Sequence, residues 1–158
     1  MNLLEDIQIE KHRLLLEEKN NIWLKSSEWL KVAESQFDGV LKNLLLSQIF
    51  LLRLSCKLEY NDAIKACEFF EKIPFEYYTE ELIKDYTFSL KLCYKFDKVI
   101  ELLKKVLDKP QWFYLEYYCL NELSDFSMVA DGALTISEYE IYKKRAIELL
   151  EKEKERKK

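Results

Sequence analysis

The chain has 158 residues, of which 49% are hydrophobic and 34% charged, with only two Gly and two Pro. Sheets need turn residues every few positions, so this composition excludes most β-rich folds and predicts an all-α protein of one domain, residues 1–158. The formal net charge of −4 disfavours nucleic-acid binding, because a broad phosphate-binding surface needs clustered Lys and Arg.

The four cysteines show no spacing typical of a metal site. They fall within apolar helical patterns, so we expect buried, reduced thiols and no metal or cofactor. The N-terminus lacks the basic start and apolar run of a signal peptide, and no apolar stretch reaches the roughly 18 residues of a membrane span. We therefore expect a cytoplasmic protein without a membrane span. The cysteines are Cys56, Cys67, Cys93 and Cys119.

Residues 1–43 are predicted to form N-terminal helices. Residues 2–20 carry a narrow apolar stripe typical of an amphipathic helix that packs on one neighbour or on a partner. A wider stripe begins at Trp23, where Ser26 or Ser27 is a candidate cap. Asp38-Gly39 is a candidate break. Residues 37–57 then form either two helices, as part of a degenerate extra repeat, or a single continuous helix.

A sequence motif is repeated between residues 44 and 110. Tyr60 corresponds to Phe96 and Pro74 to Pro110, each 36 positions later in the sequence. A fixed offset of this size is typical of helical-hairpin solenoids, whose repeats stack because none buries its apolar face alone. We therefore predict two regular repeats, each a helix, a tight turn, a second helix and a proline.

The repeats predict four helices, over residues 44–57, 63–72, 82–93 and 98–107. The first is apolar on nearly every side and should lie in the middle of the stack. Each of the other helices has a candidate turn or cap before it. These are Tyr60-Asn61-Asp62, Thr79 and Asp97.

Residues 111–150 are predicted to form a degenerate third repeat. Its first helix is expected over 111–125, and Asp131-Gly132 marks a loop insertion. Ser137 and Glu140 offer a capping box for a last helix that runs to Arg156. The tail, residues 151–158, is polar on all sides and should fray in solvent.

The motif Tyr60-x-x-Ala63-Ile64 followed by Pro74 resembles the second half of a tetratricopeptide repeat. The resemblance covers residues 44–110 well and 111–155 poorly. The sequence departs from that family in its period of 36 and in having Leu51 and Thr87 where the family has a small residue, so other helical repeats of similar period stay open. The resemblance implies a short right-handed α-α superhelix with a concave groove.

The same resemblance implies which side chains line the groove. A carboxylate clamp of the kind known in the family would use Lys84 and Asn121, but Asp85 beside Lys84 opposes an anionic ligand. The lining positions are Gln48, Leu52, Ser55, Glu81, Lys84, Asp85, Phe88, Lys91, Tyr117, Asn121 and Ser124.

Two aromatic clusters precede predicted helices, at residues 75–78 and 112–118. The favoured interpretation is that these rings fill the wedge between successive repeats. Adjacent residues on a helix cannot all face inward, so at least one of Trp112, Phe113 and Tyr114 should be exposed, and likewise Tyr117 or Tyr118. Exposed rings would serve as interface anchors. Base stacking is disfavoured by the acidic surroundings.

No catalytic constellation is apparent. The single histidine, His12, lies between Lys11 and Arg13 and is interpreted as a solvated surface residue. No glycine-rich loop is present to hold a phosphate. The sequence therefore predicts a protein that is not an enzyme.

The favoured function is a non-enzymatic protein–protein interaction module, a small adaptor or subunit of a larger intracellular assembly. The alternative is a chaperone or peptide-binding protein that holds a partner segment in the groove. An enzyme or an RNA-binding protein is the least favoured. We expect a protein or peptide partner, and a hetero-oligomer rather than a homo-oligomer. The candidate partner-binding residues are Lys84, Phe88, Lys91, Trp112, Tyr114, Tyr117 and Asn121.

Overall fold

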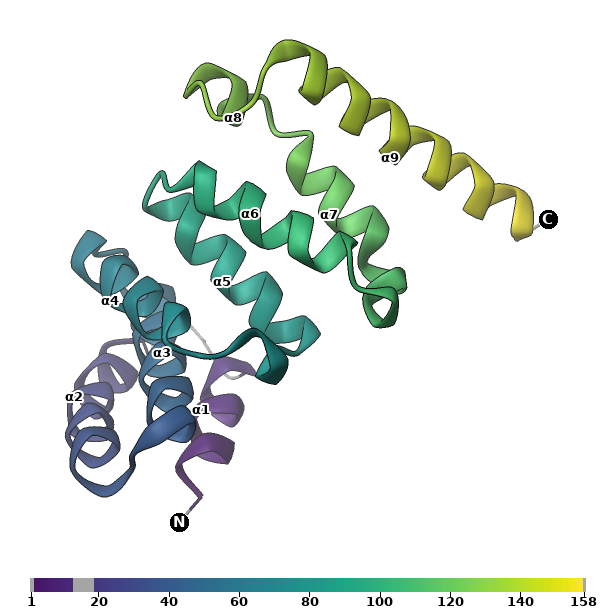
Figure 1. Cartoon of the computed structure of the whole chain (residues 1–158). Coiled ribbons are helices and arrows are strands. Elements are labelled where there is room, and N and C mark those ends of the chain that lie inside the picture. The colour runs from purple at the N-terminus through teal and green to yellow at the C-terminus, as the bar shows by residue number, and fades with distance from the viewer. Residues whose placement is uncertain (1, 13–18, 158) are drawn as a thin grey trace. The chain divides into compact units, whose positions relative to one another are not determined.

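A computed structural model describes residues 2–12 and 19–157, which are helical and contain no strand (Figure 1). The predicted all-α class is therefore confirmed. The elements in chain order are α1 (Leu3–His12), α2 (Lys19–Gln36), α3 (Gly39–Cys56), α4 (Tyr60–Glu71), the 3-10 helix η1 (Phe75–Tyr77), α5 (Glu80–Leu92), α6 (Phe96–Leu107), the 3-10 helix η2 (Pro110–Leu115), α7 (Glu116–Leu123), α8 (Phe126–Ala130) and α9 (Ile136–Arg156).

The chain divides into two compact units, residues 1–94 and 95–158, called unit 1 and unit 2 below. The boundary follows Tyr94, whose backbone φ of 55° lies in the left-handed region that non-glycine residues rarely adopt. It falls inside the stretch 44–110 that the sequence assigns to two regular repeats. The right-handed superhelix stays a prediction.

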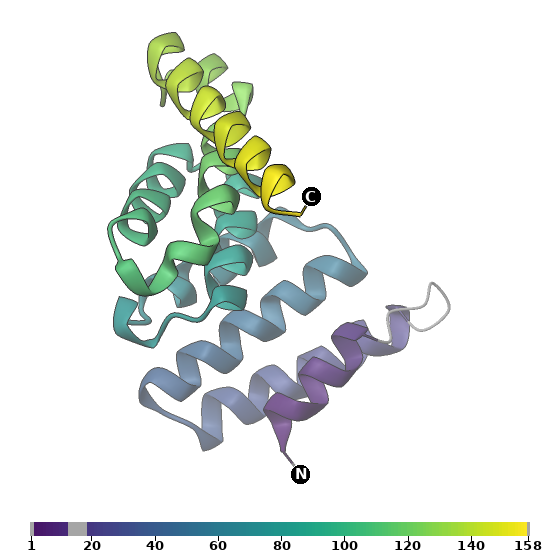
Figure 2. The ribbon, with the colours of Figure 1, turned by 90° about the vertical axis from the view of Figure 1, so that its right-hand side faces the viewer.

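The central helix of unit 1 is α3. It packs against α1, α2 and α4, and α4 packs in turn against α5 (Figures 1 and 2). Eight of its residues between Leu45 and Leu54 are buried. A helix that is apolar on nearly every side needs neighbours around it. The prediction that residues 44–57 lie among other helices is confirmed.

Helix α1 contributes to the core of unit 1. Its Leu3 and Ile7 are buried with apolar side chains of α2 and α3. The helix ends at His12, whereas the sequence predicts helix over residues 2–20; residues 13–18, with Leu14 and Leu15, lie outside the described residues. The amphipathic N-terminal helix therefore packs on this chain.

By length and composition, α3 is the one helix of the described chain that qualifies as a membrane span, with a mean hydropathy of 1.3 over 18 residues. Of that window, 44% is buried inside the structure. A core helix meets the same criteria as a span, so the burial of α3 accounts for its apolar composition. The absence of a span stays a prediction.

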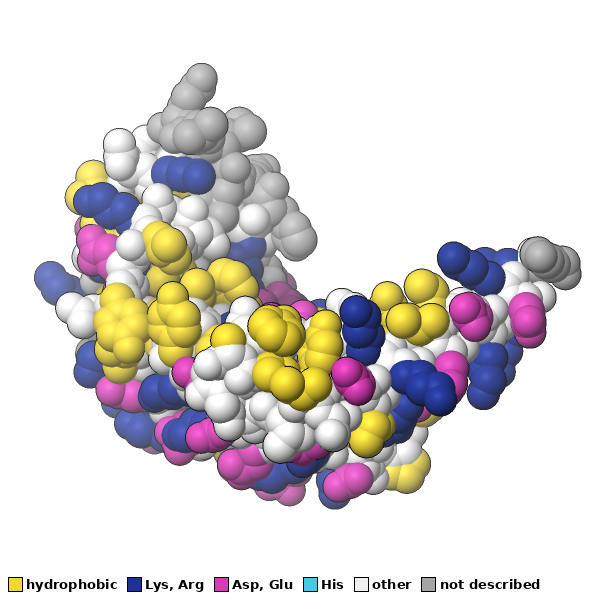
Figure 3. Space-filling model, turned by 90° about the horizontal axis from the view of Figure 1, so that it is seen from above, with side chains coloured by type: hydrophobic (Ala, Val, Ile, Leu, Met, Phe, Trp, Pro, Cys, Tyr) yellow, Lys and Arg dark blue, Asp and Glu magenta, His cyan; other side chains and the backbone are white. Residues whose placement is uncertain are grey.

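In unit 2, α6 packs against η2 and α7, and α9 packs against α7 and α8. The buried side of α6 carries Val99, Leu103 and Val106, and its opposite side carries exposed charged residues. Helix α9 ends at Arg156 as predicted. Basic and acidic side chains alternate along its C-terminal part (Figure 3). Residues 151–157 are exposed.

Two predicted N-caps are wrong. Helix α4 begins at Tyr60, so Asp62 lies in its first turn, and α6 begins at Phe96, so Asp97 lies in its first turn. The helix dipole favours acidic side chains in the first turn as well as at the cap, and the sequence does not separate the two positions. In addition, the carboxylate of Asp62 is engaged elsewhere: it accepts a hydrogen bond from Arg53 Nε at 3.3 Å.

Two of the caps that the structure shows are threonines. Thr79 accepts a hydrogen bond from the backbone N–H of Leu82 at 3.2 Å, which confirms that prediction. The capping box of α9 is formed by Thr135 and Glu138, so the predicted pair Ser137 and Glu140 is wrong. Both pairs fit the same motif. The pair one half-turn earlier in the chain satisfies the first backbone N–H groups of the helix.

Glycine makes the break between α2 and α3. The predicted break at Asp38-Gly39 is confirmed, because α2 ends at Gln36 and α3 begins at Gly39. Gly39 has a φ of 62°, which glycine adopts without a steric penalty. After this break the chain forms one continuous helix to Cys56, so of the two alternatives for residues 37–57, one helix or two, the structure shows one. Ser26 is not a cap, because it lies inside α2 and is fully buried.

The helix predicted over residues 111–125 is interrupted. Residues Pro110–Leu115 form η2, and α7 covers only Glu116–Leu123. Trp112 has non-helical dihedral angles, φ −99° and ψ 20°. This kink decides which aromatic rings reach the surface.

Candidate functional site

Four aromatic side chains gather in unit 2 where η2 meets α7. We call Trp112, Phe113, Tyr114 and Tyr117 the aromatic edge. Phe113 is 76% exposed and Tyr114 is 53% exposed, Tyr117 is also exposed and Trp112 is partly buried. The ring of Tyr114 lies between the other two rings of η2, with centroid distances of 6.0 Å to Trp112 and 5.8 Å to Phe113.

The local backbone explains this exposure. Pro110 occupies the first turn of η2, where its missing N–H costs no hydrogen bond. At the kink the side chain of Trp112 stays partly buried, and the side chain of Leu115 is buried. Phe113 and Tyr114 therefore point outward, as the sequence requires of at least one ring.

The other aromatic cluster is packed within unit 1. The ring of Tyr78 contacts those of Phe75 and Tyr86, with centroid distances of 5.0 and 6.3 Å. The Tyr78 hydroxyl donates a hydrogen bond to the carbonyl of Phe70 at 3.3 Å. Burial, and then the carboxylate of Glu71, raise the pKa of Tyr78 to about 12. The wedge interpretation therefore describes Tyr78 but not the exposed rings of the aromatic edge.

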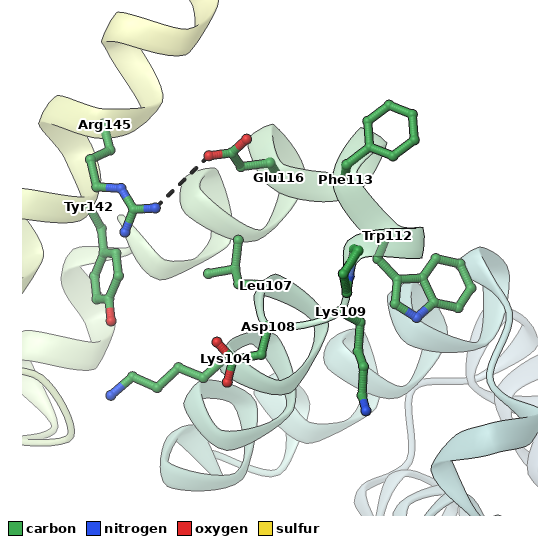
Figure 4. Close-up of a pocket in the computed structure, with 10 residues that line it drawn as sticks. Lys104, Leu107, Asp108, Lys109, Trp112, Phe113, Glu116, Tyr142 and Arg145 are labelled. Atoms are coloured by element: carbon green, nitrogen blue, oxygen red, sulfur yellow. Dashed lines mark ion pairs between the residues drawn. The ribbon is translucent and has the colours of Figure 1, made fainter.

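An open cavity of about 450 Å³ lies beside the aromatic edge, within unit 2 (Figure 4). The C-terminal end of α6 and the loop after it form one wall, η2 and the start of α7 form another, and α9 closes the third side. The lining residues are Lys104, Leu107, Asp108, Lys109, Pro110, Trp112, Phe113, Glu116, Tyr142 and Arg145.

The cavity carries more basic than acidic side chains. Its cations are Lys104, Lys109 and Arg145, and its carboxylates are Asp108 and Glu116. Figure 4 shows Arg145 of α9 and Glu116 of α7 pointing toward one another, with Nη2 and Oε1 3.9 Å apart. Neither lysine forms an ion pair with any residue that the structure describes. The cavity is thus locally cationic on a chain of net charge −4.

Three of the predicted groove positions come together in unit 1, but Lys11 of α1 bonds to them. The ammonium of Lys11 donates hydrogen bonds to Gln48 Oε1 at 2.5 Å and to Asp85 Oδ2 at 3.3 Å. Glu81 Oε1 lies 3.4 Å from the same nitrogen. Burial raises the pKa of Asp85 above its ordinary value, against the opposite effect of Lys11. The chain's own N-terminal helix therefore covers this part of the predicted groove.

The remaining residues predicted to bind a partner or to line the groove lie partly in unit 1 and partly in unit 2. In unit 1, Lys84 pairs with Glu80 of its own helix at 3.0 Å, Phe88 is exposed, and Lys91 is partly buried. In unit 2, Tyr117 and Asn121 lie one turn apart on α7, and both are exposed. Of the other implied groove positions, Leu52 is buried in the core, Ser55 is exposed, and Ser124 donates to the carbonyl of Leu120.

Sequence reasoning missed the cavity. Lys104 and Lys109 stand shortly before Pro110 and the aromatic residues, and that proximity was an available signal. Tyr142 and Arg145 offered none, because their place depends on the packing of α9 against α7. The role of Lys11 was missed for the same reason, since it joins residues far apart in the sequence.

Cys67, Cys93 and Cys119 are buried thiols. Cys67 and Cys93 are buried with their sulfur atoms 3.8 Å apart. Burial, and then the nearby carboxylates of Glu122 and Glu116, raise the pKa of Cys119 to about 12. A thiol with a raised pKa is a poor nucleophile.

Within the described ranges, no group of three or more His, Cys, Asp and Glu side chains is placed to hold a metal ion; the side chain of His12 lies outside the description.

Comparisons with protein-family models, with curated proteins and with solved structures find no match for this chain. The tetratricopeptide resemblance therefore rests on the residues that carry it, and the function must be argued from the surface of the molecule.

Proposed function

We propose that this chain is a non-enzymatic protein–protein interaction module, a small adaptor or subunit of a larger intracellular assembly. The aromatic edge is the observation that carries the proposal. Phe113, Tyr114 and Tyr117 are exposed, although large rings gain most by burial. Rings of this kind supply a large contact area at low entropic cost and are enriched among the residues that dominate interface energies. A partner that covers them would bury apolar surface that the chain itself leaves in water.

A chaperone or peptide-binding protein with a concave groove is the second proposal. The arrangement of unit 1 favours it less, because Lys11 already satisfies Gln48 and Asp85. A peptide at these positions would have to displace α1, and it would have to replace the burial of Leu3 and Ile7. The aromatic edge requires no such displacement.

The broader proposals follow from the sequence pattern. We propose a divergent tetratricopeptide-like repeat protein of the cytoplasm that forms hetero-oligomers. The repeated sequence motif supports the repeat architecture, and the exposed aromatic residues outside the repeat support a partner-binding surface. Homo-oligomers and nucleic-acid complexes are disfavoured, the latter by the net charge of −4.

The test is an affinity purification of the tagged full chain from its source cells, with quantitative mass spectrometry. The double variant Phe113→Ala/Tyr117→Ala is compared with the unchanged chain. Removing an interface anchor costs about 2 kcal/mol or more, so recovery of specific partners should fall at least about 30-fold. Circular dichroism of both proteins establishes that the helices are retained.

Two controls define the outcome. Tyr60→Ala removes an exposed ring from unit 1 and should leave recovery unchanged. Lys84→Glu/Lys91→Glu reverses the charge of the predicted groove and should also leave it unchanged. The proposal is wrong if the aromatic variant retains its partners. Loss of the partners only in the Lys84 and Lys91 variant would favour the groove instead.

A further inference from the structure

We infer that the cavity lined by Lys104, Lys109 and Arg145 binds an acidic segment of the partner protein, in which carboxylate side chains accompany an aromatic or aliphatic one. The inference rests on the proposed function and names the chemistry of the partner at that surface. The cavity and the aromatic edge share Trp112 and Phe113, so one partner segment that crosses the edge reaches the cavity.

Charge complementarity selects the acidic groups. Lys104 and Lys109 have no ion pair among the described residues, so each offers its full set of donors. Arg145 Nη2 is 3.9 Å from Glu116 Oε1, beyond hydrogen-bond distance. A guanidinium has five N–H donors in a fork that matches a carboxylate. Carboxylates of a partner would therefore find two lysines without an ion pair among the described residues, and an arginine held only by a long pairing with Glu116.

The walls of the cavity select the apolar group. Trp112, Phe113 and Tyr142 contribute rings, and Leu107 contributes an aliphatic side chain. Figure 4 shows Tyr142 on the α9 side, together with Arg145, and Trp112 on the opposite side. A side chain that buries apolar area against these walls gains about 25 cal/mol per Å². Acidic residues alone would leave the walls uncovered.

The size of the cavity fits a few side chains of a peptide. Its volume of about 450 Å³ lies within the roughly 300–1,000 Å³ of typical ligand sites. A nucleic acid is a poorer fit, because three cations beside Asp108 and Glu116 do not form the continuous track that a phosphate backbone follows. An acidic peptide meets the cations and the rings together.

A peptide-display selection on the full chain tests the inference. The probe is a random dodecapeptide library, and the best selected peptide is then labelled with fluorescein and titrated by fluorescence anisotropy. We expect enrichment of Asp and Glu next to an aromatic or aliphatic residue. The variant Lys104→Glu/Lys109→Glu/Arg145→Glu should bind that peptide at least tenfold more weakly. Raising the salt concentration should weaken binding to the unchanged chain.

Lys105→Glu is the matched control. Lys105 lies in the same last turn of α6 as Lys104, but it does not line the cavity and it pairs with Glu101. This variant should bind the peptide as the unchanged chain does. If the triple charge reversal alters the circular dichroism spectrum, the neutral variant Lys104→Gln/Lys109→Gln/Arg145→Gln replaces it, and a loss of at least fivefold is expected.

Several outcomes would overturn the inference. Selection without an acidic bias, no selected peptide, or equal binding by the charge-reversal variant would each do so. A dimer in sedimentation that the charge reversal dissociates would show that a second copy occupies the cavity. Binding of a labelled oligothymidylate in place of the peptides, abolished by the charge reversal, would assign the cavity to nucleic acid. The proposed function is separable, because loss of cellular partners in Phe113→Ala/Tyr117→Ala would uphold it even if the charge reversal had no effect.

Discussion

The two units use their charged side chains differently. In unit 1, Lys11 joins α1 to α3 and α5, and Arg53 joins α3 to α2 and α4. In unit 2, Lys105 pairs with Glu101 of its own helix, and Lys104 lines the cavity without an ion pair among the described residues. Charges that hold helices together are unavailable to a ligand. The comparison therefore contrasts two helix-joining cations of unit 1, Lys11 and Arg53, with Lys104 of unit 2, whose charge is available to a ligand.

The largest expected effect comes from Arg53→Ala. Arg53 donates to Asp62 Oδ1 at 3.3 Å and to Ser26 Oγ at 2.8 Å, and its guanidinium lies 3.8 Å from the ring centroid of Trp23. Removing it leaves a buried carboxylate without its cation, and the other oxygen of Asp62 already has no hydrogen-bond partner. We expect the free energy of unfolding to fall by about 3–5 kcal/mol in urea denaturation.

Arg145→Ala is the matched arginine of unit 2. Its side chain is 48% exposed and its pairing with Glu116 is long, so the change should cost less than about 1 kcal/mol. Adding Asp62→Ala to Arg53→Ala should recover part of the loss, because the unpaired carboxylate is removed with it. Equal losses for the two arginine variants would contradict the comparison.

The next effect comes from Ile7→Ala in α1. Ile7 is fully buried in the core of unit 1, and its truncation leaves a cavity between α1, α2 and α3. We expect a loss of about 2–5 kcal/mol in urea denaturation, with faster hydrogen exchange in α1. Ile9→Ala changes an exposed residue of the same helix and should cost less than about 0.5 kcal/mol. Equal losses would mean that α1 is not packed through Ile7.

The sequence predicted those features of the fold that depend on neighbours along the chain. The helical class, the break at Gly39 and the cap at Thr79 follow from composition, backbone freedom and local hydrogen bonding. The side chains of Ser26 and Asp62 are of types that favour N-caps, so the sequence predicts caps at both residues. Their actual partner is Arg53, which lies on another helix, and no local pattern indicates it. The boundary between the two units after Tyr94 could not be predicted either, because the repeated sequence motif lies on both sides of it.

The candidate site was predictable to the same extent. Adjacent aromatic residues cannot all face inward, and this rule predicted at least one exposed ring among Trp112, Phe113 and Tyr114 without a structure. The kink at Trp112 then decided which rings are exposed. The cavity could not be predicted, because Arg145 and Tyr142 reach it only through the packing of α9. The groove positions Gln48 and Asp85 do meet, but only the structure shows that Lys11 lies on them.

A smaller effect is expected for Tyr78→Phe, which removes the hydrogen bond to the Phe70 carbonyl. At pH 7 the loss should be about 1 kcal/mol. Tyr78 in the folded chain keeps its proton to a pKa of about 12, whereas the unfolded chain loses it near the ordinary value of 10.0. Its contribution to stability is therefore complete below pH 10 and declines as the pH rises toward 12. Urea denaturation from pH 7 to 11.5 measures both effects.

The comparison of Tyr78→Phe with the unchanged chain isolates this group from the other residues that titrate in alkali. The variant should lose stability less steeply than the unchanged chain above pH 10. Tyr77→Phe, an exposed neighbour, should change the stability at pH 7 by less than about 0.5 kcal/mol. Parallel profiles of Tyr78→Phe and the unchanged chain would show that the Tyr78 hydroxyl is not in a buried environment.

The smallest expected change in the free energy of unfolding comes from a surface lysine, Lys105, and it contrasts with the partly buried lysine Lys11. Lys105 Nζ lies 3.6 Å from Glu101 Oε1 on the surface of α6, so Lys105→Ala should cost about 0.3–0.5 kcal/mol, and about 1 M NaCl should abolish the difference. The Lys11 side chain is only 17% exposed and bonds to groups of two other helices, so the loss caused by Lys11→Ala should persist in the same salt. Urea denaturation of both variants at low and high salt measures the contrast. If salt abolished both losses, Lys11 would be a surface pair like Lys105, and α1 would be held to unit 1 mainly by apolar contacts such as those of Leu3 and Ile7.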